Sequence, residues 1–186
     1  MTETIAQIIG IFAAATNILS FQCKAKNRII LVQLFGGALF TVNFLLLGAV
    51  TGAIMNVLAI VRALLFLYKD KLKINDRVLV IGLIATFLGV YVLTFTAFGV
   101  EATLKNLIVE ALPVIGMSAA TLSFSMKNGT AIRIIGITLS SPSWLVYNIF
   151  VFSIGAILCE AFSIVSIAIG IFRHDINRKS KAEKEA

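Results

Sequence analysis

The chain has 186 residues, of which 59% are hydrophobic and only 13% are charged. That composition excludes a soluble globular domain and predicts an all-α, polytopic membrane protein whose main partner is the lipid bilayer. The formal net charge of +7 would suit nucleic acid, but the Lys and Arg residues lie in short gaps between apolar stretches, which argues against a nucleic-acid partner.

Seven apolar runs are long enough to cross a hydrocarbon core of about 30 Å. Their predicted bounds, in chain order, are Ile5–Ser20, Ile29–Leu47, Ala53–Tyr68, Val78–Phe95, Leu107–Phe124, Ile134–Phe152 and Ile154–Phe172. Residues 48–52 separate the second run from the third, and a short segment around Ser153 separates the sixth from the seventh. Each of these pairs is therefore expected to form a tight helical hairpin. Residues 1–4 lack the basic region of a signal peptide, so the first run is expected to be a mature helix.

Basic residues gather in alternate loops. They follow the first, third, fifth and seventh runs, as Lys24, Lys26 and Arg28; Lys69, Lys71, Lys73 and Arg77; Lys127 and Arg133; and Arg173, Arg178, Lys179, Lys181 and Lys184. Lys105 is the clearest basic residue of the other side. Because Lys and Arg are retained on the cytoplasmic side, we expect the amino terminus outside and a polar tail, residues 174–186, in the cytoplasm.

Parts of the chain repeat at a shared offset of 103 positions. Leu19-Ser20-Phe21 recurs as Leu122-Ser123-Phe124, and Gly52-Ala53-Ile54 recurs as Gly155-Ala156-Ile157. The matches predict two parallel three-helix repeats joined by a linker helix, with a binding site between them. The predicted divisions are residues 1–68 for the first repeat, 69–102 for the basic loop and linker, 103–173 for the second repeat, and 174–186 for the tail.

Several polar side chains lie inside the predicted spans, where a central charge costs about 2.5–3.5 kcal/mol. Asn56 and Glu160 lie at related depths in the third helix of each repeat, and we expect both to line a cavity that binds a solute. The alternative for Asn56 is a hydrogen bond to a neighbouring helix. Arg62 either pairs with Glu160 or directs its stem toward the cytoplasmic headgroups.

A polar-aromatic group lies within the sixth run. Trp144, Tyr147 and Asn148 are expected to contact the solute, with Asn43 of the second run as a further candidate. Packing or anchoring at the interface is the alternative for the two aromatic residues. Pro142 predicts a weak point in the sixth helix, which serves either as a gate hinge or as a structural bend.

Motifs for enzymatic or cofactor chemistry are absent from the sequence. The one histidine, His174, lies in the tail, and there is no Gly-rich phosphate loop or metal-ligand spacing. Cys23 and Cys159 form neither a disulfide framework nor a CxxC pair. We therefore expect no enzymatic activity, no cofactor and no metal.

Two groups of motifs resemble the YgjV-type bacterial inner-membrane proteins. The first half contributes Phe21-Gln22-Cys23-Lys24, Gln33-Leu34-Phe35-Gly36, residues 43–49, Thr51-Gly52-Ala53, Asn56 and Arg62. The second half contributes residues 144–148 and the run from Gly155 through Glu160 to Arg173. The resemblance implies a bacterial inner-membrane protein of poorly defined activity.

The layout of three, one and three helices is also similar in architecture to the SWEET and PQ-loop carriers. Phe21-Gln22 stands where a PQ-loop protein has Pro-Gln, and Pro113 and Pro142 are the only prolines. The resulting hypothesis is a carrier of a small polar solute that works by alternating access, either down the solute gradient or coupled to protons through Glu160. The alternative is a non-transporting receptor or scaffold with the same cavity. The sequence leaves the oligomeric state open, a homo-oligomer included.

Overall fold

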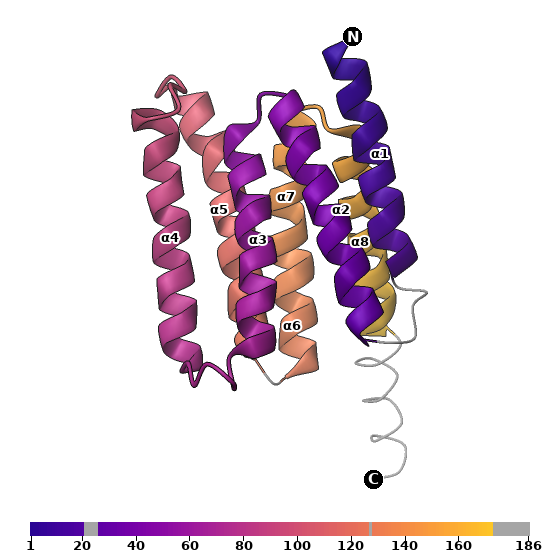
Figure 1. Cartoon of the computed structure of the whole chain (residues 1–186), viewed down its shortest axis with the longest axis vertical. Helices are drawn as coiled ribbons and strands as arrows, with labels where there is room; N and C mark the ends of the chain where they lie inside the picture. The colour runs from indigo at the N-terminus through magenta and orange to yellow at the C-terminus, as the bar shows by residue number, and fades with distance from the viewer. Residues whose placement is uncertain (21–25, 127, 173–186) are drawn as a thin grey trace.

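The computed structural model describes residues 1–20, 26–126 and 128–172, and these residues are helical with short connections (Figure 1). The elements are α1 (Thr2–Ser20), α2 (Lys26–Leu46), α3 (Val50–Tyr68), α4 (Asp76–Thr96), α5 (Leu104–Ser125), α6 (Gly129–Ile135), the π-helix η1 (Gly136–Ser140), α7 (Ser141–Phe150) and α8 (Ile154–Ile171). Because α6, η1 and α7 are contiguous, they form one rod, and the described residues make seven helical segments. The predicted tail, residues 174–186, and the basic residues Lys24 and Lys127 lie outside the described residues.

The predicted all-α class is confirmed, and most helices start a few residues earlier than the apolar runs. Polar caps explain the earlier starts of three helices. The side chains of Asn75, Thr103 and Asn128 accept hydrogen bonds from the backbone amides of Arg77 (2.8 Å), Asn106 (3.2 Å) and Thr130 (3.0 Å) at the starts of α4, α5 and α6. A reading of apolar runs misses such turns because their residues are polar.

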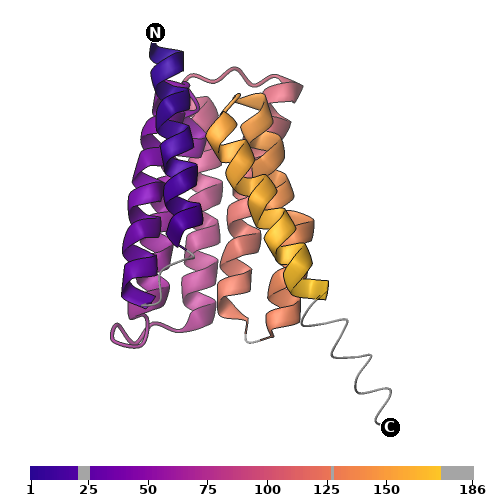
Figure 2. The same cartoon turned by 90° about the vertical axis from the view of Figure 1, so that its right-hand side faces the viewer.

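The helices stand in two rows that close into a ring. In one row α2 packs between α1 and α3, and in the other the α6–α7 rod packs between α5 and α8. The rows meet where α1 contacts α8 and where α3 contacts α5, and α4 lies outside the ring against α3 and α5. Figures 1 and 2 show the helices running alternately up and down, with the amino terminus at the end opposite to the last turn of α8.

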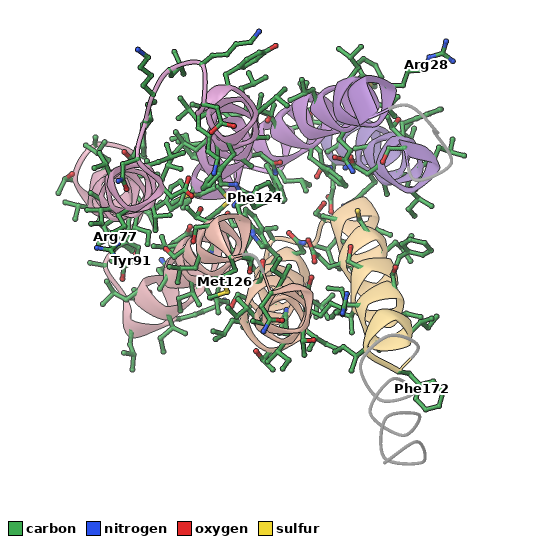
Figure 3. All side chains as sticks on the ribbon, turned by 90° about the horizontal axis from the view of Figure 1, so that it is seen from below. Arg28, Arg77, Tyr91, Phe124, Met126 and Phe172 are labelled. Atoms are coloured by element: carbon green, nitrogen blue, oxygen red, sulfur yellow. The ribbon has the colours of Figure 1, made fainter. Side chains whose placement is uncertain are left out.

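The two ends of the ring differ in charge. The α3–α4 connection carries Lys69, Lys71 and Lys73 at the end that we call the basic end, and Arg28 and Arg77 lie there too (Figure 3). Lys69 Nζ bonds Asp76 Oδ1 at 2.6 Å, and this hydrogen bond raises the pKa of the Lys69 ammonium. The turns between α2 and α3 and between α7 and α8 lie at the opposite end.

The outer surface of the ring is apolar. Five helices, α1, α3, α4, α5 and α8, are long and apolar enough to cross a bilayer, and α2 holds a shorter apolar stretch at Leu31–Leu46. Large apolar side chains are more than half exposed on several helices, among them Phe12, Leu31, Phe35, Ile81, Val92 and Ile169. Apolar exposure over so many helices is typical of a surface that faces lipid.

Glycine allows α1 and α8 to touch near the opposite end. A Cβ atom added to Gly155 would lie 2.0 Å from the carbonyl oxygen of Gly10, so the two backbones are in direct contact. Small residues at such crossings let membrane helices approach closely and gain van der Waals contact. Any larger residue at position 155 must push the two helices apart.

We expect Gly155→Ala to lower stability in detergent by about 1–3 kcal/mol, because the added methyl group overpacks the α1–α8 contact. The matched control is Gly89→Ala in α4, where no atom lies within 4 Å of the added methyl group. The control should be neutral or gain about 0.5–1 kcal/mol, since alanine favours helix over glycine. Thermal unfolding of both variants tests the contact, and equal effects of the two substitutions would contradict it.

Candidate functional site

A cavity of about 820 Å³ lies inside the ring of helices. Its described lining residues come from every helical segment except α4. The lining includes Met126 and Ile132, which lie at the basic end and are each 37% exposed. Figure 3, a view from the basic end, shows Phe124 near the middle of the bundle, and Phe124 also lines the cavity. The cavity therefore reaches the basic end of the molecule.

Four of the six predicted solute-binding residues line this cavity: Asn56 of α3, Trp144 and Asn148 of α7, and Glu160 of α8. Arg62 of α3 lines it as well. The structure thus brings residues from the two halves of the chain to one space. The other two predicted residues, Asn43 and Tyr147, are fully buried and do not line the cavity.

Aromatic rings cover the cavity on the side away from the basic end. The ring of Phe44 stacks on Trp144, with 6.4 Å between centroids, and lies 6.1 Å from the ring of Tyr147. The Tyr147 hydroxyl accepts a hydrogen bond from the Gly52 amide at 3.0 Å. We call Phe44, Trp144 and Tyr147 the aromatic roof. Phe44 and Tyr147 are fully buried, and Phe44 and Trp144 line the cavity.

Polar side chains close the opposite end beyond the roof. The Asn43 amide donates to the carbonyl of Ala6 at 2.7 Å and accepts from the Ser153 hydroxyl at 2.7 Å. Gln7 donates to the carbonyl of Phe152 and accepts from the amide of Ile154 at 3.0 Å. We call Gln7, Asn43 and Ser153 the polar clamp. It ties α1 and α2 to the turn between α7 and α8.

Unsatisfied and charged groups lie together below the roof. The Glu160 carboxyl lies beside the Ser141 side chain. Asn148 is only 2% exposed, and its Oδ1 atom is buried without a hydrogen-bond partner among the described residues. A buried acceptor without a partner costs about 1–3 kcal/mol, which a bound donor would recover. The deep part of the cavity is therefore suited to a hydrogen-bond donor.

Arg62 lies nearer to the basic end of α3. Its guanidinium lies 4.9 Å from the ring centroid of Phe124 and donates to the Met117 carbonyl at 3.4 Å, while Nε is buried without a partner in the described part of the chain. No ion pair between Arg62 and Glu160 is found among the described residues, where the one salt bridge joins Lys69 to Asp76. Contacts with α5 hold the guanidinium inside the bundle. Because no carboxylate of the described residues pairs with it, the guanidinium is available to an anionic group.

The predicted weak point at Pro142 adjoins a change in helix type. The π-helix η1 spans Gly136–Ser140, and the Ser141 amide bonds the carbonyl of Gly136, five residues earlier. Pro142 follows in the first turn of α7, inside the contiguous rod, and has no amide hydrogen to donate to the turn before it. Gly136, Ser140 and Ser141 line the cavity. The wide turn thus lies at the cavity wall, as π-turns in functional sites often do.

The sequence reasoning missed several lining residues. Phe40, Phe44, Ser163 and Ser166 line the cavity, but aromatic and hydroxyl side chains carry no charge and so give little signal inside an apolar run. The spacing on α8 offered a clue. The lining residues Ala156, Cys159, Glu160, Ser163 and Ile167 recur at the three- and four-residue intervals of one helix face.

A model of the family Imp-YgjV, described as a bacterial inner membrane protein, matches residues 4–178. The match covers almost the whole chain and indicates no enzymatic family. No curated protein and no solved structure matches the chain.

Cys159 gives a direct test of the cavity, because Cys23→Ser leaves it as the single thiol of the chain. A charged, membrane-impermeant thiol reagent should modify Cys159 from one side of the membrane only. That side should be the one from which Arg77→Cys reacts, whereas Lys105→Cys should react from the other side. Modification of Cys159 from the Lys105 side alone, or from neither side, would contradict a cavity that reaches the basic end.

Proposed function

The chain belongs to the Imp-YgjV family of bacterial inner membrane proteins, and we propose that it is a carrier that moves a small polar solute by alternating access. The supporting observation is the one-sided cavity. Its lining includes Asn56, Arg62 and Glu160, and it reaches the basic end while the roof and clamp close the other end. Charged side chains within membrane helices are expensive, and they mark solute and ion pathways.

The orientation is part of the proposal. Lys71, Lys73 and Arg77 lie at the basic end, and the rule that positive loops stay inside favours a cytoplasmic position for that end. The described cavity is then the inward-facing state of the carrier. The amino terminus and Lys105 face the periplasm, and the tail at residues 174–186 follows α8 into the cytoplasm.

We further propose two parallel repeats, residues 1–68 and 103–173, with the loop and linker helix α4 within residues 69–102. Gln7 of α1 bonds the first residue of α8, and Glu110 of α5, its counterpart at the offset of 103, lies beside Thr51 in the first turn of α3. The contact of α1 with α8 likewise corresponds to that of α5 with α3. These paired contacts favour a twofold axis along the membrane normal, with the cavity between the repeats.

Transport then requires the two repeats to rock about the solute. Opening the periplasmic side breaks the polar clamp, and the groups of Gln7, Asn43 and Ser153 exchange their mutual hydrogen bonds for water. Closing the cytoplasmic side brings Phe124 and Met126 toward the facing helices. Glu160 lines the moving cavity, so its protonation could couple the rocking to a proton gradient, whereas simple movement down the solute gradient needs no such change.

Proteoliposomes test the carrier directly. Radiolabelled alanine, glycine betaine, glucose, succinate and putrescine are each offered as probes, and at least one should enter in a saturable manner. Saturable binding of a probe without any flux would instead identify a receptor. A panel with neither binding nor flux would contradict the proposal.

A reversible lock tests alternating access. Gln7→Cys with Ile154→Cys, in a chain that carries Cys23→Ser and Cys159→Ser, places two thiols where Gln7 now bonds α8. Oxidation should reduce flux about tenfold or more, since the clamp can no longer open, and a reductant should restore it. Each single-cysteine variant is the matched control. Unchanged flux in a double variant whose two thiols are shown to be lost on oxidation would exclude opening at the clamp.

A further inference from the structure

We propose that the cavity binds a small zwitterion, namely a free amino acid with an uncharged side chain, with its ammonium group below the aromatic roof and its carboxylate toward the basic end. The proposal rests on the proposed carrier function only for transport, because binding can be measured separately. It follows from the distribution of charges and unpaired polar atoms along the cavity.

The deep part of the cavity suits an ammonium group. Glu160 supplies a carboxylate, and the buried Oδ1 atom of Asn148 supplies an acceptor without a partner in the described residues. Phe44 and Trp144 line the same region, and aromatic rings attract cations. The Oδ1 atom of Asn148 is closed off in this state, so an N–H donor reaches it only when the side chain turns toward the cavity. A primary ammonium has one to give, whereas a quaternary ammonium has none.

The part nearer the basic end suits a carboxylate. The Arg62 guanidinium stays charged, and its planar fork matches the two oxygens of a carboxylate. Phe124 and the Met117 carbonyl hold it in place, and no carboxylate of the described residues neutralises it. Arg133 also lines this part of the cavity and adds to the positive potential.

The two charged groups differ in depth. Helices α3 and α8 start at the same end, Arg62 lies twelve residues after Val50, and Glu160 lies six residues after Ile154. At a rise of 1.5 Å per residue, Arg62 is about 9 Å nearer to the basic end. A zwitterion placed between them can lie with its ammonium toward Glu160 and its carboxylate toward Arg62.

Singly charged and neutral solutes fit the same charges less well. A monovalent cation leaves Arg62 without a counter-ion, a monovalent anion leaves Glu160 without one, and a sugar leaves both uncompensated. The cavity volume of about 820 Å³ is within the usual range for small-molecule sites. A free amino acid thus satisfies the charges and the acceptor together.

The single tryptophan of the chain, Trp144, lines the cavity and reports binding through its own fluorescence. Leucine, 3-methylbutylamine, 4-methylpentanoate, glycine betaine and glucose are titrated into the purified protein in nanodiscs. Leucine should change Trp144 emission saturably, and both singly charged analogues should bind about tenfold more weakly or worse, because each loses a charged hydrogen bond. Glycine betaine should also bind more weakly than leucine, and glucose should give no signal.

Two substitutions assign the ends of the solute. Arg62→Gln should remove the preference for leucine over 3-methylbutylamine, and Glu160→Gln should remove the preference for leucine over 4-methylpentanoate. Arg77→Gln and Glu101→Gln make the same chemical changes outside the cavity lining and should leave both preferences intact. If either cavity variant fails to stay monodisperse, Arg62→Lys or Glu160→Asp replaces it, with a smaller loss of the same preference expected.

The possible outcomes distinguish failure of the zwitterion site from failure of the carrier function. Equal affinity for leucine and its singly charged analogues, or a glucose response without a leucine response, would overturn the zwitterion site. Preferences that survive both cavity substitutions would also overturn it. Selective leucine binding without leucine flux in proteoliposomes would leave the site standing and reject the carrier.

Discussion

Charged side chains within membrane-spanning helices are costly, and this cost governs how the bundle is arranged. Arg62 and Glu160 lie in apolar helices, and among the described residues they form no ion pair with each other. The bundle meets this cost by turning both side chains inward to one cavity that reaches the basic end. Water or a solute in that cavity stabilises the charges, whereas lipid could not. A ring of helices around a cavity meets that requirement.

The two ends of the ring differ: the aromatic roof and the polar clamp lie at one end, whereas the cavity reaches the other. Beyond the aromatic roof, the polar clamp joins α1 and α2 to the α7–α8 turn through side-chain amides and a hydroxyl. Water can replace such bonds at modest cost, so a polar closure can open and reform. The Gly10–Gly155 contact lies near the clamp and is a close backbone crossing of α1 and α8. At the basic end the described residues Met126 and Ile132 remain partly exposed.

The seven helical segments could be predicted from the sequence because each corresponds to one of the seven apolar runs. The exact helix starts could not, because polar caps set three of them. The common cavity of Asn56 and Glu160 was also foreseeable, since both polar residues lie at similar depth in long apolar helices. The clamp role of Asn43 was not, because its partners Ala6 and Ser153 are far away in the chain. Tyr147 and Trp144 are both aromatic residues of the same apolar run, so the sequence does not distinguish their roles. Tyr147 is fully buried in the roof, whereas Trp144 lines the cavity. The π-helix before Pro142 depends on packing against α5, which a single sequence does not reveal.

We propose that the cavity faces the two sides of the membrane in turn. Pulsed electron–electron double resonance measures the distance between two spin labels placed across one end of the ring. One sample carries labels at Glu3 and Lys105 for the clamp end, and a second carries labels at Lys71 and Asn128 for the basic end. The account predicts two distances at each end, with a saturating solute moving the populations in opposite directions at the two ends. One unchanging distance at both ends, with and without solute, would contradict it.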